Sequence, residues 1–260
     1  MRPKRLYRFT NPIEINIQIV GIKMNKMPNF LLRLIHASSQ DFDGINFSTS
    51  WNALAKAPPI FHERIKSDYR FLNFINETSG LMGMEGDFFP DVQPLSNIIH
   101  AIAKLDVDKE ACEGIISAIV EKGDWIAARG KSQEVANTAW AFARLEVDAP
   151  AFFAALDRRG EWLADEVNTQ EAGNIAWALA KARIDAPTFF NALEGKGKWI
   201  VESGKAQEIS NIYWAFANLK ICGRGVVGKN FFGAVEKDAE RLVELMNPQE
   251  CSNVAWAIAE

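Results

Sequence analysis

Hydrophobic and polar positions recur along the second half of the chain with a period of roughly 37 to 42 residues, which is typical of helical-repeat proteins. Three segments of the form Gln-Glu-x-x-Asn-x-x-Trp-Ala-x-Ala align without gaps and begin at Gln133, Gln170 and Gln207. Weaker copies begin at Gln93 and Gln249, and the spacing is longest at the two ends of this series. The segment is therefore the unit of an internal repeat.

Each repeat is predicted to hold two helices of fixed length, joined by a connection that varies from roughly 7 to 12 residues. In the helix that follows each glutamine, here called helix B, apolar residues recur with helical period, as at Ala172, Ile175 and Leu179. A neighbouring face that contains Asn174 and Trp177 is also patterned, which predicts a helix packed on two sides.

The other helix of each repeat, here called helix A, contains a glycine at position 123, 160 or 197. A glycine inside a helix costs roughly 1 kcal/mol, so we expect helix A to be kinked or split at this point. Ser132 and Thr169, directly before the glutamine, are predicted N-caps of helix B.

These patterns predict an all-α fold, an α-solenoid of helix-pair repeats of roughly 37–42 residues. Residues 1–40 are predicted to be a basic N-terminal extension, and residues 41–92 a degenerate repeat with a loop over 78–91. Residues 93–260 are predicted to be the repeat array. Its last repeat is incomplete, as expected of a fragment of a longer protein.

The charges are divided unevenly along the chain. Residues 1–40 carry seven Lys and Arg against the single acid Glu14, while the remainder has a balance of −10. The acidic repeat region counts against a purely electrostatic nucleic-acid binder. The basic start is compatible with an organelle transit peptide, although the segment from Phe30 to His36 can equally be the first helix of the array.

Composition excludes several other classes of protein. The three cysteines stand far apart, which gives no support for a disulfide framework or a structural zinc site. No apolar run approaches the ~20 residues of a membrane-spanning helix, so no membrane association is expected. No nucleophile–base constellation, metal-ligand cluster or cofactor motif is found, and we predict no enzymatic activity.

Gly223, Gly225 and Gly228 spell Gly-x-Gly-x-x-Gly, but in a loop between helices, where a dinucleotide site is not expected.

The repeat motif, most complete in residues 133–145 and 207–219, resembles that of the octotricopeptide-type repeat proteins of algal organelles. It is also similar to repeats of the FAST-kinase-like family of mitochondria and of the trypanosomatid RNA-editing substrate-binding complex. The resemblance extends over the predicted array, positions 93–260. It implies a protein that binds single-stranded organellar RNA and acts in RNA processing, stability, editing or translation, alongside other RNA-processing proteins. The expected location is the mitochondrion, with the chloroplast as the alternative. Many relatives end in a RAP domain, and nothing similar follows here, so nuclease-like activity has no support.

Two kinds of recurring residue in helix B are candidate RNA contacts. The asparagines could contact bases, or they could form a ladder of hydrogen bonds between neighbouring helices, which their identity in every repeat favours. They are Asn97, Asn137, Asn174, Asn211 and Asn253.

The tryptophans could stack on bases, but their strict spacing beside alanines favours packing between repeats. They are Trp140, Trp177, Trp214 and Trp256 in helix B, and Trp125, Trp162 and Trp199 in helix A. His100 takes the tryptophan position in the first repeat and is predicted to be packed rather than a ligand.

The position four residues after each tryptophan holds a cation or an amide: Lys104, Arg144, Lys181 and Asn218. Stacked repeats would align these into a basic column suited to phosphates, although cations near a helix C-terminus also complement the helix dipole. The cations of helix A are weaker candidates, because solvated charge is the default for them. They are Arg158, Arg159, Lys196, Lys198 and Lys237. The rival to RNA binding is a protein–protein scaffold of the TPR or HEAT kind, which the acidic repeat region favours.

Overall fold

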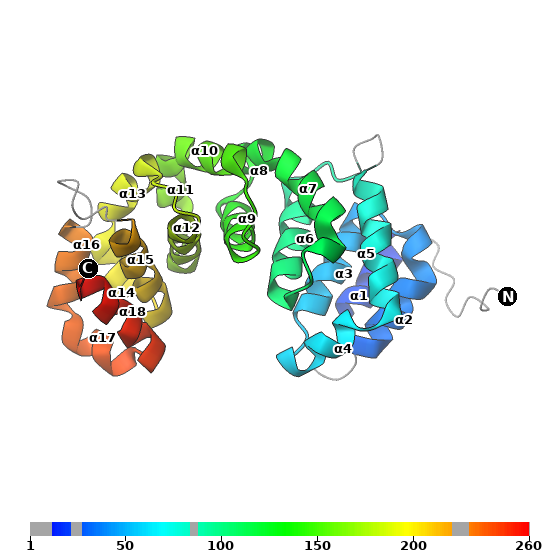
Figure 1. Cartoon of the computed structure of the whole chain (residues 1–260), viewed down its shortest axis with the longest axis horizontal. Helices are drawn as coiled ribbons and strands as arrows, with labels where there is room; N and C mark the ends of the chain where they lie inside the picture. Colours follow the sequence, from blue (N-terminus) through cyan, green and yellow to red (C-terminus); the bar gives the residue numbers. More distant parts are fainter. Residues whose placement is uncertain (1–11, 22–27, 84–87, 220–228, 260) are drawn as a thin grey trace. The chain divides into compact units, whose positions relative to one another are not determined.

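The computed structural model describes residues 12–21, 28–83, 88–219 and 229–259 (Figure 1). Within these residues the regular structure is entirely helical, with eighteen α-helices, three short 3₁₀ helices and no strand. The predicted all-α class is confirmed. The chain divides into two compact units, residues 1–122 and 123–260. None of the described helices is long and apolar enough to cross a bilayer.

The first unit consists of two layers of helices. One layer packs α1, α3 and α6 side by side in that order, and the other packs α2, α5 and α7. The helices are α1 (Pro12–Gly21), α2 (Pro28–Ser38), α3 (Gly44–Ala55), α4 (His62–Lys66), α5 (Tyr69–Met82), α6 (Val92–Leu105) and α7 (Glu113–Glu121). The degenerate repeat at Trp51 therefore lies in α3, beside the helix B of the first clear repeat. Trp51 is fully buried, and its indole Nε1 donates a hydrogen bond to Thr78 Oγ1 at 3.1 Å.

Two parts of the first unit differ from what the sequence predicted. The predicted loop over 78–91 begins too early, because α5 continues to Met82 and buries Thr78 against Trp51. Residues of the predicted N-terminal extension belong to the core: Ile15 of α1 and Ile35 of α2 are both 0% exposed. The segment from Phe30 is thus a packed helix of this unit.

The second unit repeats a helix B and a divided helix A. The helix B positions are α9 (Ser132–Arg144), α12 (Thr169–Lys181), α15 (Ala206–Asn218) and α18 (Pro248–Ala259), and they pack side by side in chain order (Figure 1). Helix A is represented by α8 (Gly123–Arg129), α10 (Pro150–Arg158) with α11 (Gly160–Glu166), α13 (Pro187–Glu194) with α14 (Gly197–Ser203), and α16 (Lys229–Lys237) with α17 (Ala239–Leu245). The predicted stacking of helix pairs is therefore present in this unit.

Close contact between successive repeats explains why glycine stands at the break in helix A. A Cβ placed on Gly160 would lie 2.3 Å from the backbone N of Phe189, and one on Gly197 would lie 2.6 Å from Phe231 Cα. The second half of each helix A thus touches the backbone of the next helix A, and only glycine leaves room for it. The expected break is confirmed, and packing between repeats accounts for the glycine at this position.

Carboxylates of one helix A accept hydrogen bonds from the start of the next helix A. The Asp157 Oδ1 accepts a hydrogen bond from the backbone N–H of Phe189 at 3.0 Å. Glu194 accepts from the backbone N–H of Asn230 at 2.6 Å and from its side-chain amide at 2.9 Å. Each carboxylate therefore satisfies the N-terminal amides of the following helix, where negative charge is favoured.

Guanidinium groups make the complementary connection at the other end. Arg159 donates to the backbone carbonyls of Ala127 at 2.6 Å and Gly130 at 2.9 Å, at the C-terminus of α8. Arg241 donates to the carbonyl of Val201 at 2.8 Å, at the equivalent place in α14. These cations supply hydrogen-bond donors to carbonyls at the helix end of the preceding repeat.

Helix B begins one residue earlier than predicted. The N-cap of α12 is Asn168, whose side chain accepts from Glu171 N at 2.9 Å, while the Thr169 hydroxyl instead donates to Glu208 Oε2 in the next repeat at 2.6 Å. In α9, likewise, Ser132 is the first helical residue. The recurring Gln-Glu pair places its glutamate at the third helical position, where it accepts the N-cap backbone N–H.

Candidate functional site

One face of α9 remains accessible although the rest of the helix is packed. Gln133, Asn137, Trp140 and Arg144 are spaced by four, three and four residues, so they follow a single stripe along the helix. Each of them is exposed or half-buried. The residues between them are predominantly buried, and Phe142 is 0% exposed. The stripe is therefore the solvent-facing side of the helix.

The same stripe recurs on the two helices that follow. It comprises Gln170, Asn174, Trp177 and Lys181 on α12, and Gln207, Asn211, Trp214 and Asn218 on α15. We call these twelve residues the helix-B face. Across the three helices they form a glutamine row, an asparagine row (Asn137, Asn174, Asn211), a tryptophan row (Trp140, Trp177, Trp214) and a terminal row (Arg144, Lys181, Asn218).

The rows require neighbouring helices to run in the same direction, and two contacts show that they do. At the N-terminal ends, Thr169 of α12 is bonded to Glu208 of α15. At the C-terminal ends, Lys181 of α12 reaches Glu146, which follows α9, with 3.0 Å between Nζ and Oε1. Neighbouring helices are therefore parallel, with equivalent residues side by side.

The asparagine row does not form the predicted ladder of hydrogen bonds. Within the described residues, the side-chain amides of Asn137, Asn174 and Asn211 form no hydrogen bond, and all three are half-buried. The predicted contact occurs only in the first unit, where Asn97 Nδ2 donates to Ser48 Oγ at 3.2 Å. The amides of the second unit are thus available to a ligand.

The tryptophan row lies between the core and the solvent-facing side of the helices. Trp140, Trp177 and Trp214 are half-buried, and the core positions two residues later are filled by the fully buried Phe142 and Phe216. The indoles are therefore partly open to solvent. The side chain of the fourth tryptophan, at position 256, lies outside the described part of the chain.

The terminal row carries its cations at the surface. Lys181 and its partner Glu146 are 42% and 72% exposed, and exposed ion pairs contribute about 0–1 kcal/mol. Arg144 is exposed, with its guanidinium carbon 6.0 Å from the centroid of the Trp140 ring. Asn218 is half-buried. The fourth predicted member, Lys104, is exposed at the end of α6 in the first unit.

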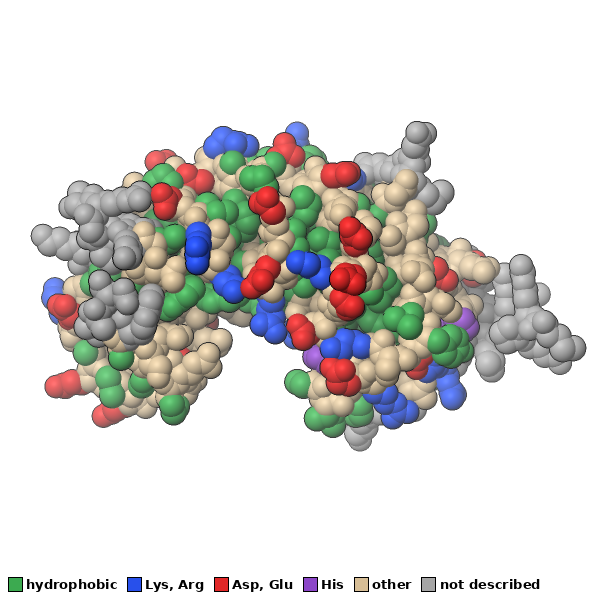
Figure 2. Space-filling view, viewed as in Figure 1, with side chains coloured by type: hydrophobic (Ala, Val, Ile, Leu, Met, Phe, Trp, Pro, Cys, Tyr) green, Lys and Arg blue, Asp and Glu red, His purple; other side chains and the backbone are tan. Residues whose placement is uncertain are grey.

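The acids near the face are turned toward helix ends. Glu134 accepts from the backbone N–H of Lys131 at 2.9 Å, and Glu208 accepts from that of Lys205 at 3.0 Å. These carboxylates are partly neutralised by the helix N-termini that they cap. On the face seen in Figure 2, Lys and Arg side chains are interspersed with Asp and Glu over the described residues, with no large region of one sign.

His100 occupies the tryptophan position in α6 and, like the tryptophans, is half-buried. Burial lowers the pKa of its ring to about 4, with a smaller contribution from the charge of Lys104. The ring is therefore neutral at pH 7. No group of three or more His, Cys, Asp or Glu within the described residues could hold a metal ion.

The helix A cations are mostly engaged in structure. Arg159 lies 3.8 Å above the ring of Trp162 in addition to its carbonyl contacts, and Lys196 Nζ lies 2.9 Å from Asp165 Oδ1. Of the remaining weak candidates, Lys198 and Lys237 line one groove, described next, and Arg158 is exposed on α10.

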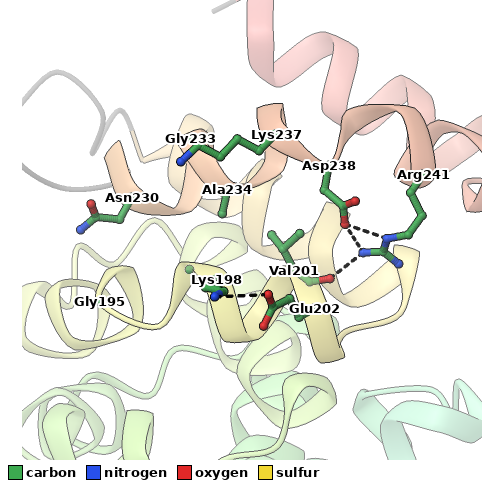
Figure 3. A pocket seen from close by; sticks show the side chains of 11 residues that line it. Gly195, Lys198, Val201, Glu202, Asn230, Gly233, Ala234, Lys237, Asp238 and Arg241 are labelled. Carbon is green, nitrogen blue, oxygen red and sulfur yellow. Dashed lines mark hydrogen bonds and ion pairs between the residues drawn. The ribbon is translucent and has the colours of Figure 1, made fainter.

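A groove of about 950 Å³ lies between α14 and the pair α16–α17 (Figure 3). It is lined by cations and acids in nearly equal number, and most of them are paired. Lys198 lies 3.6 Å from Glu202, and Arg241 is bonded to Asp238. This arrangement presents little unbalanced charge to a ligand, so the groove is a weaker candidate than the helix-B face.

A comparison of the sequence with models of known protein families and with curated proteins finds no match. The glycines at 223, 225 and 228 lie outside the described residues.

Proposed function

We propose that the chain is a single-stranded RNA-binding protein and that the helix-B face is its RNA-binding surface. The observation that carries this proposal is the recurrence of one ordered stripe on three parallel, neighbouring helices. Each stripe offers a side-chain amide, a partly open indole, and a cation or second amide. A ligand with matching periodicity, such as a polynucleotide lying across the helices, would meet the same groups in each repeat.

The chemistry of the rows suits an unpaired strand. Stacking of a base on an aromatic side chain contributes about 1–3 kcal/mol and accepts any base. Cations in the terminal row lie about 6 Å further along the helix than the indoles, within reach of the backbone phosphates of a stacked nucleotide. A phosphate can displace the exposed Glu146 from Lys181 at little cost.

The motif resemblance extends the proposal to a cellular role. On that basis we place the protein in organellar RNA processing, stability or translation, together with other RNA-processing proteins. The mitochondrion is the preferred compartment and the chloroplast the alternative.

Fluorescence anisotropy of the full chain with a short labelled RNA, titrated over a range of salt concentrations, tests the proposal. Because Arg144 and Lys181 are the only cations of the helix-B face, we expect a shallow salt dependence, with a logarithmic slope of about −1.4. The double variant Arg144→Gln, Lys181→Gln should weaken binding and bring the slope close to zero. The control Arg158→Gln, Lys198→Gln removes the same charge from helix A and should change neither.

A protein–protein scaffold is the second candidate, favoured by the mixed charges of the surface and the acidic balance after residue 40. Absence of RNA binding at low salt would refute the RNA proposal and favour the scaffold. Equal loss of affinity in the two double variants would show that RNA binds elsewhere.

A further inference from the structure

We propose that the asparagine row contacts the ribose 2′-hydroxyl groups of the bound strand and so selects RNA over DNA without selecting a base sequence. This inference rests on the proposed function, since it assigns a role within the same surface. It goes beyond that function because an RNA-binding surface need not distinguish the two sugars.

The identity of the row points to a feature shared by every nucleotide. The same residue type stands at Asn137, Asn174 and Asn211, whereas the terminal row changes from Arg to Lys to Asn. A position that reads bases must differ between repeats if the protein is to recognise a mixed sequence. Three identical amides can instead recognise the backbone, which is the same at each step.

The amide group matches a hydroxyl better than a phosphate. Its NH₂ donates and its carbonyl accepts, and the 2′-hydroxyl does both. A phosphate only accepts, so it would leave the amide carbonyl without a donor. The face already provides Arg144 and Lys181 for phosphates.

The position of the row fits this assignment. Asparagine and tryptophan of one stripe are three residues apart, or about 4.5 Å along the helix axis. The 2′-hydroxyl is on the carbon next to the one that carries the base, so it lies close to any base that stacks on the indole. The amides are half-buried and form no hydrogen bond among the described residues, so contact with a hydroxyl would satisfy groups that are otherwise left to solvent.

The first test uses the wild-type protein and changes only the sugar. Oligonucleotides containing only adenine and cytosine are compared as RNA, as DNA and as 2′-O-methyl RNA, because the bases are then identical in all three. A hydrogen bond contributes roughly a two- to tenfold change in affinity, so three of them predict at least about a tenfold preference for RNA over DNA. The 2′-O-methyl strand, which cannot donate, should bind more weakly than RNA.

The second test removes the row. The triple variant Asn137→Ala, Asn174→Ala, Asn211→Ala should bind RNA as weakly as wild type binds DNA, with DNA affinity unchanged. A matched control replaces three exposed asparagines of helices α5 and α13, in the variant Asn73→Ala, Asn76→Ala, Asn191→Ala. It should keep the full preference for RNA.

The outcomes separate the two proposals. Equal affinity of wild type for RNA and DNA would overturn this inference while leaving strand binding intact. A strong preference for one homopolymer that the triple variant abolishes would show base reading and would also overturn it. Failure to bind any strand would refute the proposed function itself.

Discussion

Replacing Gly160 with alanine tests whether contact between repeats, rather than local helix propensity, determines the residue at the break in helix A. The added Cβ would lie 2.3 Å from Phe189 N, 2.7 Å from Phe189 Cα and 2.8 Å from the carbonyl carbon of Thr188. All three are backbone atoms of the next repeat, so no side-chain rotation can relieve the contact.

The two effects have opposite signs. Alanine is favoured over glycine in a helix by about 1 kcal/mol, so propensity alone predicts a more stable protein. Carbon atoms in contact prefer about 3.5–4.0 Å, so the repeats must separate by roughly 1 Å, and overpacking of this kind costs about 1–3 kcal/mol. Separation also stretches the Asp157 hydrogen bond to Phe189 N, which contributes about 1 kcal/mol more. We expect a net loss of about 1–3 kcal/mol.

Urea unfolding followed by far-UV circular dichroism measures the change. The control is Gly233→Ala in α16, where an added Cβ meets nothing within 4 Å, so the variant should gain about 0.5–1 kcal/mol. Because stability in repeat arrays depends on neighbour contacts, the slope of the transition is compared as well as its midpoint. A Gly160→Ala protein as stable as wild type, or more stable, would refute the assignment.

Two further predictions concern polar groups. Arg159→Ala should lower the free energy of unfolding by about 2–3 kcal/mol, since it removes charge-assisted hydrogen bonds to the carbonyls of Ala127 and Gly130. Urea midpoints compared with those of the exposed-site control Arg158→Ala check this, and equal midpoints would contradict it. Stability should also fall as the pH drops from 6.5 toward about 4, because the folded-state pKa of His100 is about 4 against an ordinary 6.5 and the unfolded chain binds the proton more tightly. The free energy of unfolding should fall by about 3 kcal/mol by pH 4. This fall should be absent from the pH profile of His100→Gln. A His100→Gln protein with the wild-type profile would show that His100 is not the cause.

The sequence was sufficient to predict the repeats because their periodicity reflects packing that recurs in every unit. Fixed segment lengths identified both helices, and the glycine of helix A identified the break. The reason for a glycine there was not predictable from propensity, because the atoms that exclude a Cβ at Gly160 belong to residues 188 and 189 of the next repeat. A contact between two repeats cannot be inferred from the residues of one repeat alone.

The candidate site was only half predictable. The sequence singled out the recurring positions that form the helix-B face, but it favoured packing for Trp177 and a hydrogen bond between helices for Asn174. A large apolar ring is by itself a core signal. The better signal was the spacing of Gln170, Asn174, Trp177 and Lys181 by four, three and four residues, since three of these residues are polar and the fourth must share their face. Read in that way, the indole belongs to the solvent side.

The last repeat shows how differently the two layers use their polar residues. At the position of Arg159 it has Asp238, and at that of Trp162 it has Arg241. The cation has thus moved by three residues, yet its guanidinium still reaches the equivalent carbonyl of the preceding helix A. Two different side-chain arrangements that preserve one contact indicate that the contact, and hence the joining of repeats, is what these cations provide. In the helix-B face the opposite holds, because Asn137, Asn174 and Asn211 keep their identity although their side chains form no hydrogen bond among the described residues. An amide that recurs without a hydrogen-bond partner of its own is a candidate for a partner outside the chain, and that is why the amides, rather than the more numerous charges of helix A, are the groups to test first.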